Sequence, residues 1–354
     1  MKSTLEIVKD KITELGDLYK RMDNTMEKLY PEQFPYELTL YNSDIKTKKT
    51  ETISVTSNIA AVFVDAVASD LMAGIWQDVI EGKPKVSARQ TRVIEAFIGD
   101  MRAQADEELC NEFDIPSLDS WLAKHICERG IIGAFWLSIV ENKKLKLRCL
   151  PVDMRWTPFE RGVKGLKWFA PITTRTVASI KEEFEKDLKG KGISLPDSQT
   201  TGVKITDFWD DTFNEVWIDS QLVRSQKHKL GRPPGVIVGA ASGTMLRDAG
   251  YLQHENEDLL QFIRHLIDEH NRNLSVKQTA GQNGIIGRYE AEQEIIDGSP
   301  SHPIPGSGQT LDVAKGGKHV LVPMPDSNVA FRSADAEISQ EIQMGSISNA
   351  ELAD

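Results

Sequence analysis

The sequence predicts an α+β fold from three features of its apolar pattern. Helical periodicity dominates residues 1–130, and strand-like segments cluster between residues 131 and 238. A long amphipathic segment follows at 252–274, then a stretch rich in Gly, Pro and Ser at 279–328, and then a second helical segment at 334–344. Because most helices come first and the strands follow as a group, the order is typical of an α+β protein and not of alternating βαβ units.

Composition is that of an ordinary globular chain. A length of 354 residues is enough for two domains with proper cores. The chain is 40% hydrophobic and 27% charged, as is typical of globular proteins. The net charge of −11 argues against a broad surface that grips nucleic-acid phosphates, but it allows a protein that lets DNA pass without holding it. The apolar run at 59–75 is interrupted by Asp65, Ser69 and Asp70, so we expect no membrane span.

The three cysteines, Cys110, Cys127 and Cys149, lie in apolar surroundings and show no C-x-x-C spacing. We therefore expect buried thiols in a reducing compartment. The first residues, MKSTLEIVKD, are a polar helix start and not a signal sequence. No cofactor is predicted, because the chain has no G-x-x-x-x-G-K-[ST] phosphate loop and no G-x-G-x-x-G after a strand.

The first helix begins at a capping box formed by Ser3 and Glu6. Apolar residues then recur at alternating spacings of three and four up to Pro31, which ends the helix. Such a seam either docks on the chain's own domain or contacts another subunit, and the pattern leaves both open. The seam residues are Leu5, Val8, Ile12, Leu15, Tyr19, Met22, Met26 and Leu29.

Further helices and strands follow in the expected order. Ser117 is a good N-cap and Gly130 a good stop for the helix between them. The predicted helices cover about 58–75, 88–113, 117–130 and 177–188. The predicted strands cover 131–140 and 145–150 as a hairpin, then 166–176, 203–209, 215–219, 222–226 and 236–238.

A long helix is expected at 252–274. Its apolar residues fill an arc of roughly 160° on a helical wheel, whereas packing on a single neighbour needs only about 100°. We therefore expect this helix to pack against more than one neighbour, with identical chains covering part of it. The side chains expected in this inter-subunit packing are Leu252, Leu259, Ile263, Leu266 and Ile267. The opposite face, which includes Glu257, Asp258, Gln261, Arg264, His265, Asp268, Glu269 and Arg272, is expected to be solvated.

The remainder of the chain predicts a small β-rich module and a returning helix. Strand-like pieces occur at 285–289, 294–296 and 319–322 among Gly- and Pro-rich loops. The helix at 334–344 ends at Gly345. Ser348 and Glu351 then form a second capping box, whose helix has barely begun at Asp354, so we expect a longer natural protein.

One cluster of carboxylates could serve chemistry, and two interpretations of it remain open. Two-metal nucleases gather carboxylates around paired Mg²⁺ ions, which makes a metal-dependent nuclease one hypothesis. The same residues around positions 210–214 also suit the polar tip of a hairpin, which is the favoured interpretation. The cluster comprises Asp207, Asp210, Asp211, Glu215 and Asp219.

From about Trp121 to its end the sequence resembles the portal proteins of tailed bacteriophages. The resemblance is one of pattern and includes no invariant catalytic signature. The stretches that carry it are Arg-Gly-Ile-Ile-Gly at 129–133, Leu-Arg-Cys-Leu-Pro-Val-Asp at 147–153 followed by Trp156, the helix-like stretch 251–275, and Val-Leu-Val-Pro-Met-Pro at 320–325.

The resemblance implies a portal-like α+β fold made of an α/β wing, a helical stem and a small β-rich clip. The wing would cover residues 1–245, the descending stem helix 246–278 and the clip 279–329. The returning stem helix would cover 330–345, and residues 346–354 would begin a truncated tunnel-loop and crown region. No catalytic role is implied, so an enzyme is not expected.

The resemblance also implies a function and partners. Portal proteins form rings, usually dodecamers, at one vertex of the virion capsid. They conduct double-stranded DNA during packaging and ejection, and they dock the large terminase and then the head-tail connector, beside capsid or scaffold proteins. Assembly would take place in the host cytoplasm. Candidates for the DNA-channel wall are Arg332, Gln340 and Gln343, for which an outward solvated face is an equal alternative. Another phage structural adaptor or scaffold is the second hypothesis, and the nuclease is the third.

Overall fold

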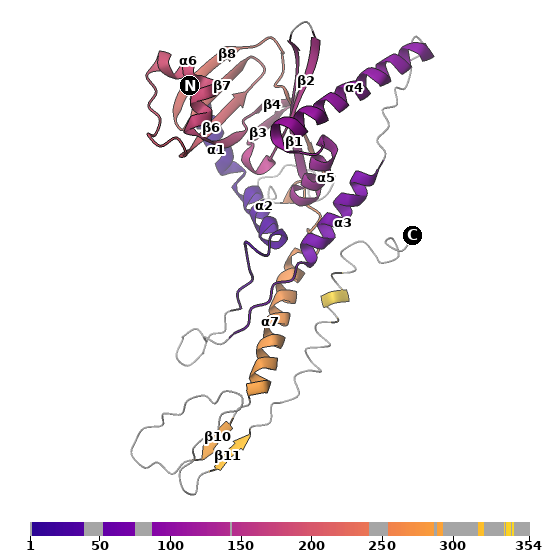
Figure 1. The fold of residues 1–354 in the computed structure, drawn as a ribbon, viewed down its shortest axis with the longest axis vertical. Coiled ribbons are helices and arrows are strands. Elements are labelled where there is room, and N and C mark those ends of the chain that lie inside the picture. The colour runs from indigo at the N-terminus through magenta and orange to yellow at the C-terminus, as the bar shows by residue number, and fades with distance from the viewer. Residues whose placement is uncertain are drawn as a thin grey trace. The chain divides into compact units, whose positions relative to one another are not determined.

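The computed structural model describes residues 2–38, 52–74, 87–141, 144–240, 254–286, 289–292, 318–321, 336, 338–340 and 342. These residues contain helices and antiparallel sheets, which confirms the α+β class (Figure 1). The chain divides into two compact units. Unit 1 comprises Met1–Met26 and Val64–Leu260, and unit 2 comprises Glu27–Phe63 and Gln261–Asp354.

The helices predicted at 58–75, 88–113, 117–130 and 177–188 are confirmed, with shifted ends. Ser117 caps α5 by accepting a hydrogen bond from the Ser120 N–H, and Gly130 ends it in the left-handed region at φ 69°. The helices are α1 (Thr4–Glu14), α2 (Gly16–Leu29), α3 (Ile59–Ala73), α4 (Ala88–Phe113), α5 (Leu118–Arg129) and α6 (Val177–Lys191). A short 3-10 turn, η1, covers Met154–Trp156.

The single helix expected up to Pro31 is interrupted at Leu15, which separates α1 from α2. Gly16 directly follows, and a glycine lowers helix stability by about 1 kcal/mol relative to alanine. The apolar seam is buried within unit 1: Val8 packs with Trp168 and Phe208, and Leu15, Leu18, Tyr19 and Met22 pack with Ile131 and Met154. Docking on the chain's own domain therefore accounts for these seam residues.

Unit 1 contains two antiparallel sheets. The predicted hairpin at 131–150 is confirmed as β1 (Ile131–Glu141) and β2 (Lys144–Val152), with β9 (Gly235–Gly239) on the other side of β1. The second sheet has the order β3-β4-β6-β7-β8, and β5 also pairs with β6. Its strands are β3 (Phe159–Gly162), β4 (Gly165–Phe169), β5 (Ile172–Thr176), β6 (Gly202–Trp209), β7 (Phe213–Ile218) and β8 (Gln221–Lys227).

The strand expected at 166–176 is divided into β4 and β5 by Ala170 and Pro171. Proline has no N–H for a sheet ladder, so an uninterrupted strand there would lack one hydrogen bond. The Pro171 carbonyl instead accepts from the Asp207 N–H at 3.0 Å. As a result, β4 pairs with the end of β6 and β5 pairs with its beginning.

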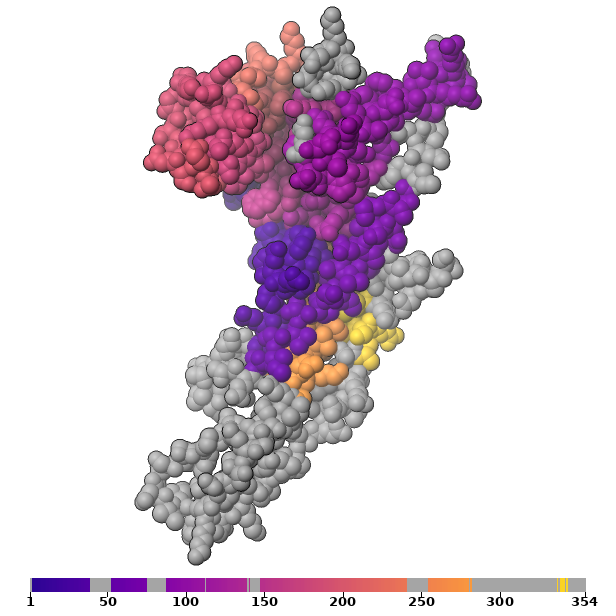
Figure 2. All heavy atoms as spheres, viewed as in Figure 1, coloured from indigo at the N-terminus to yellow at the C-terminus, as the bar shows by residue number. Residues whose placement is uncertain are grey.

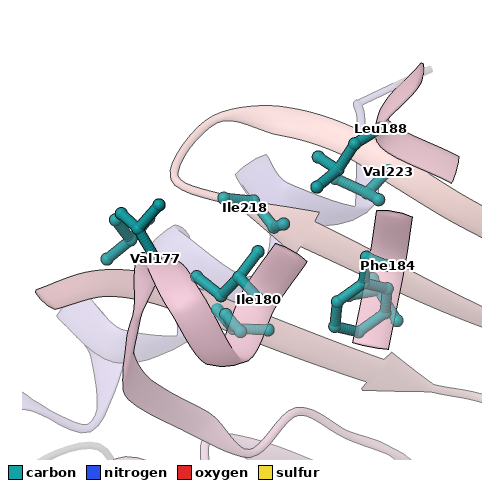
Figure 3. Packing of buried hydrophobic residues seen from close by; sticks show 9 residues of the cluster. Val177, Ile180, Phe184, Leu188, Ile218 and Val223 are labelled. Carbon is teal, nitrogen blue, oxygen red and sulfur yellow. The ribbon is translucent and has the colours of Figure 1, made fainter. Parts of the chain in front are cut away.

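Helix α6 covers one face of the second sheet, as Figure 3 shows. Val177, Ile180, Phe184 and Leu188 follow one another at helical spacing and are buried. They pack on apolar residues of three neighbouring strands, namely Val203, Ile205, Val216, Ile218 and Val223. At about 1.5–3 kcal/mol for each large side chain removed from water, this cluster is a main source of the stability of unit 1.

Unit 2 contains α7 (Arg264–Ile286) and a two-stranded antiparallel sheet of β10 (Tyr289–Glu292) and β11 (Lys318–Leu321). Residues 336, 338–340 and 342 are helical, within the returning helix predicted at 334–344. The strand expected at 294–296 lies outside the described residues.

The predicted start and end of the helix at 252–274 are both wrong. Residues 254–263 form turns and one bridge, and α7 begins only at Arg264 and continues to Ile286. The β-rich segment expected from residue 279 therefore does not begin there, and residues 285–286 are helical and not extended.

Three polar side chains of α7 bind the backbone of segment 52–57, an arrangement that we call the polar ladder. They are spaced by four residues, so they lie on one helical face, and all three are buried. Four helical residues advance about 6.0 Å and two extended residues about 6.6 Å, so every second N–H of the segment meets one of them. The pairs are Ser57 N with Asn271 Oδ1 (2.8 Å), Val55 N with Ser275 Oγ (2.8 Å) and Ile53 N with Thr279 Oγ1 (3.0 Å).

The other edge of segment 52–57 is held by its own side chains. Thr56 Oγ1 accepts from the Tyr36 N–H at 2.8 Å, and Ser54 Oγ accepts from the Leu38 N–H at 3.0 Å. Thr52 Oγ1 donates to the Leu38 carbonyl at 3.1 Å. The alternation of the extended chain thus places backbone groups on the α7 side and hydroxyls on the side of residues 36–38.

The polar ladder generates a first prediction. Ser275→Ala should speed amide hydrogen exchange at Val55 and its neighbours by about tenfold or more, because a buried N–H without its acceptor costs about 1–3 kcal/mol. Gln278→Ala, on the exposed face of the same helix, is the matched control and should leave that exchange unchanged. Equal protection of Val55 in both variants would contradict the ladder.

Candidate functional site

The last residues of unit 1, 254–260, lie against the buried Arg21 of α2 and against the backbone at the end of α5. Arg21, only 6% exposed, donates from Nη1 to the Glu255 carbonyl at 2.7 Å and from Nη2 to the Asn256 carbonyl at 3.0 Å. Asn256 has φ 49°, in the left-handed region that asparagine tolerates better than most residues. This arrangement, which we call the charged clasp, fixes the path of segment 254–260.

Two buried carboxylates balance Arg21 in the charged clasp. Glu257 Oε2 lies 3.5 Å from Arg21 Nη1, and Asp258 Oδ2 lies 4.0 Å from Nε. Asp258 also accepts from Thr25 Oγ1 at 2.8 Å. The expectation that Glu257 and Asp258 lie on a solvated face is wrong. Removing one partner of such a buried pair leaves an uncompensated charge, which costs about 3–5 kcal/mol.

The charged clasp explains why no helix forms before Arg264. In a helix the carbonyls of Glu255 and Asn256 would accept from residues 259 and 260. Here both carbonyls bind Arg21, the Leu259 N–H donates to the Cys127 carbonyl at 3.0 Å, and the Leu260 N–H donates to Asp258 Oδ1 at 2.9 Å. Local apolar spacing predicts a helix, but tertiary hydrogen bonds determine the structure.

A second group of ion pairs continues the clasp toward η1. Arg129 Nη2 binds Asp153 Oδ2 at 2.9 Å, and Arg129 Nη1 donates to the Met22 carbonyl at 3.4 Å. Arg155 makes a bidentate contact with Asp23 at 2.7 and 2.8 Å, and its guanidinium lies 4.9 Å from the centre of the Tyr19 ring. The hydrogen bond with Asp23 raises the pKa of Arg155. These contacts hold α2 and α5 against η1.

Two glycines allow segment 254–260 to approach this closely. A Cβ on Gly130 would lie 1.9 Å from the Asn256 carbonyl oxygen, and Gly130 also has a φ of 69°. A Cβ on Gly239 would lie 1.7 Å from Asn256 Oδ1. Gly130 excludes any side chain, because the atoms that it would meet belong to the backbone of the segment, whereas a side chain on Gly239 would require the Asn256 side chain to move.

His125 is a neutral group beside the clasp. Its ring stacks on Trp121 with 3.6 Å between the ring centres. Burial, which disfavours the charged imidazolium, lowers the pKa of His125 from 6.5 to about 4, opposed by nearby Asp153. Burial also raises the pKa of Glu128 on the same helix.

The residues expected in inter-subunit packing have different environments. Ile263 and Ile267 are each 1% exposed in the single chain, so the expectation that a neighbouring chain covers them is wrong. Leu259 and Leu266 are half-buried, and Leu252 lies outside the described residues. Among the candidates for a DNA-channel wall, Gln340 is helical and exposed, whereas Arg332 and Gln343 lie outside the described residues.

The acidic cluster is dispersed over the second sheet. Asp210 Oδ1 accepts from the N–H groups of Thr212 and Phe213, both at 2.6 Å, which is the turn role favoured from the sequence. Asp219 occupies the β7–β8 turn at φ 51°, and Glu215 binds the Thr4 hydroxyl and the Trp217 indole N–H. Asp207 binds the Asn214 amide at 2.6 Å. Within the described residues, no three His, Cys, Asp or Glu side chains gather as metal ligands would.

Burial raises the pKa of Cys127 to about 11 and that of Cys149 to about 12, so both are unreactive thiols. The expectation of a buried thiol is confirmed for these two and is wrong for Cys110, which is exposed.

No protein-family model and no curated protein matches this chain. None of the helices in the described ranges has both the length and the apolar character needed to cross a membrane.

A second prediction concerns the close approach at Gly130. Gly130→Ala should lower the free energy of unfolding of unit 1 by several kcal/mol, because the new Cβ adds a backbone clash to the cost of the left-handed φ. Gly192→Ala is the matched control: it has a similar φ of 64° but no atom within 4 Å, so it should cost only about 1 kcal/mol. Urea unfolding followed by tryptophan fluorescence measures this difference, since every tryptophan among the described residues lies in unit 1. Equal losses in the two variants would refute the close approach.

A third prediction concerns acid stability. Because the pKa of His125 in the folded chain, about 4, lies below the ordinary value of 6.5, the unfolded chain binds more protons between these pH values. The free energy of unfolding should therefore fall by up to about 3 kcal/mol as the pH is lowered through this window. His125→Phe, which keeps an aromatic ring against Trp121, should remove this part of the pH dependence. An unchanged pH profile in the variant would show that His125 is not responsible.

Proposed function

We propose that this chain is a ring-forming portal subunit of a tailed bacteriophage, a conduit for double-stranded DNA. The observation that carries the proposal is the order of elements along the chain. An α+β unit is followed by the long helix α7, then by the small sheet β10–β11, and then by further helical residues at 336, 338–340 and 342. This is the order of wing, stem, clip and returning stem that the sequence resemblance implies.

Helix α7 has the dimensions of a structural rod. Its 23 residues span about 35 Å. The polar ladder occupies one of its faces, while His265, Glu269 and Arg272 are exposed elsewhere on its surface. A helix of this length, with charged residues exposed on its surface, could lie beside the same helix of a neighbouring subunit in a ring.

Exposed apolar side chains on two other helices support self-association. Val93 is 63%, Ile94 41% and Phe97 50% exposed on the first half of α4, which Figure 2 shows extending at the upper right. On α3, Val62 is 58% exposed. Contiguous apolar surface of this kind marks interaction sites in soluble proteins. We assign the first half of α4 to a contact with the neighbouring subunit.

The charge of the chain suits a conduit. A net charge of −11 disfavours tight contact with phosphates, and tight contact would retard DNA that must slide through a ring. Exposed Gln340 is an uncharged candidate for the channel wall, and the sequence offers Arg332 and Gln343 as further candidates. The role requires no covalent chemistry, which agrees with the turn and packing roles of Asp210 and Glu215.

The proposed partners follow from the proposed function. They are identical subunits, for which the family's usual ring is a dodecamer, together with double-stranded DNA, the large terminase, the head-tail connector and capsid or scaffold proteins. The proposed location is the portal vertex of the virion, with assembly in the host cytoplasm.

A fourth prediction tests self-association through α4. The chain should form large oligomers at micromolar concentration, and Val93→Asp with Phe97→Asp should shift them to single chains, because both substitutions place a charge in the exposed apolar surface of α4. Val163→Asp is the matched control, since Val163 is a fully exposed apolar residue outside α4 and its replacement should leave the oligomers intact. Mass photometry distinguishes the species. A single-chain mass for the unaltered protein would overturn the proposal, and large oligomers in all three proteins would move the contact away from α4.

A further inference from the structure

Unit 1 contains a cavity of about 320 Å³ between its two sheets, bounded also by α6 and by the end of α4. Its walls are mostly apolar and include Phe135 of β1, Val152 of β2 and Val216 of β7. This volume is at the small end of the range of about 300–1,000 Å³ for pockets that bind small molecules. The portal proposal makes no use of this cavity.

One cation in the cavity wall lacks a hydrogen-bond partner for a buried atom. Arg224 of β8 lines the cavity, and its guanidinium lies 4.9 Å from the centre of the Phe184 ring. Its Nε is enclosed and has no hydrogen-bond partner. Leaving a buried N–H of a charged group without an acceptor costs free energy. The Arg224 Nε–H is therefore available to donate to a bound ligand.

The other charged groups that line the cavity do not neutralise Arg224 and repel an anion only weakly. Arg175 is paired with Glu183, so these two charges cancel. Asp207 is bonded to Asn214 and forms no ion pair within 4 Å with Arg224 among the described residues. Burial raises the pKa of Asp207, so its carboxyl keeps its proton to higher pH than a solvated aspartate and repels an anion less.

We propose that this cavity binds a compact amphipathic carboxylate, such as a medium-chain fatty acid. The apolar body would lie between Phe135 and Val216, and the carboxylate would accept from Arg224 Nε. The mixture of apolar walls and a cation whose Nε has no hydrogen-bond partner distinguishes this site from a purely apolar cavity, which would favour an uncharged ligand. The inference is independent of the portal proposal.

Calorimetric titration with octanoate and with 1-octanol tests the proposal on the whole chain. Octanoate should bind once per chain and about tenfold or more tighter than octanol, because it alone offers a charged acceptor. Arg224→Gln should reduce octanoate binding to the level of octanol. Lys227→Gln is the matched control, because Lys227 lies on the same strand and over another ring, that of Phe213, and its loss should leave octanoate binding unchanged. A far-UV spectrum like that of the unaltered chain shows that each variant is folded.

A second variant locates the ligand. Val216→Phe fills the cavity from β7, and it should abolish the binding of both octanoate and octanol. The proposal is overturned if octanoate does not bind, if octanol binds equally well, or if Val216→Phe leaves binding intact. Binding of an apolar peptide through its C-terminal carboxylate and Arg224, without binding of octanoate, would also overturn it and would make the cavity a docking site for a chain end.

Discussion

A buried backbone N–H or carbonyl must have a hydrogen-bond partner, and this requirement determines the structure at the decisive points of both units. In unit 2, segment 52–57 meets side chains of α7 instead of a neighbouring strand, and a spacing of four residues in the helix matches a spacing of two in the segment. In unit 1, Arg21 takes two carbonyls that a helix would have used. The polar ladder holds segment 52–57 on α7, and the charged clasp determines the path of residues 254–260, which precede α7 in the sequence.

The same requirement separates what the sequence predicts from what it does not. Local signals were sufficient for α4, α5, α6 and the β1–β2 hairpin, where caps, glycine stops and periodicity agree with the fold. They failed at residues 254–263, whose apolar spacing is helical but whose N–H groups bind Cys127 and Asp258. They failed also at Pro171, where one expected strand becomes two. Tertiary partners decided the first case, and a single sequence does not reveal them, whereas the missing N–H of Pro171 is a local feature that the sequence shows.

The candidate sites show the same division. The turn role of Asp210 follows from its neighbours in sequence, and the structure confirms it. The charged clasp was missed because Arg21 and Glu257 are far apart in sequence and resemble ordinary solvated residues. The only available signal was the position of Arg21 beside the apolar seam, next to Met22. The ladder residue Ser275 gave no signal, since a helical serine is usually exposed or bonded within its own helix.

The proposed portal role depends on identical chains surrounding an axis, with surfaces such as the first half of α4 between them. Ile263 and Ile267 no longer support that role, because the single chain buries them. Electron microscopy of the purified protein tests the claim most directly. The account predicts closed rings with cyclic symmetry and a central opening wide enough for duplex DNA, whereas isolated chains or two-fold dimers without an opening would contradict it.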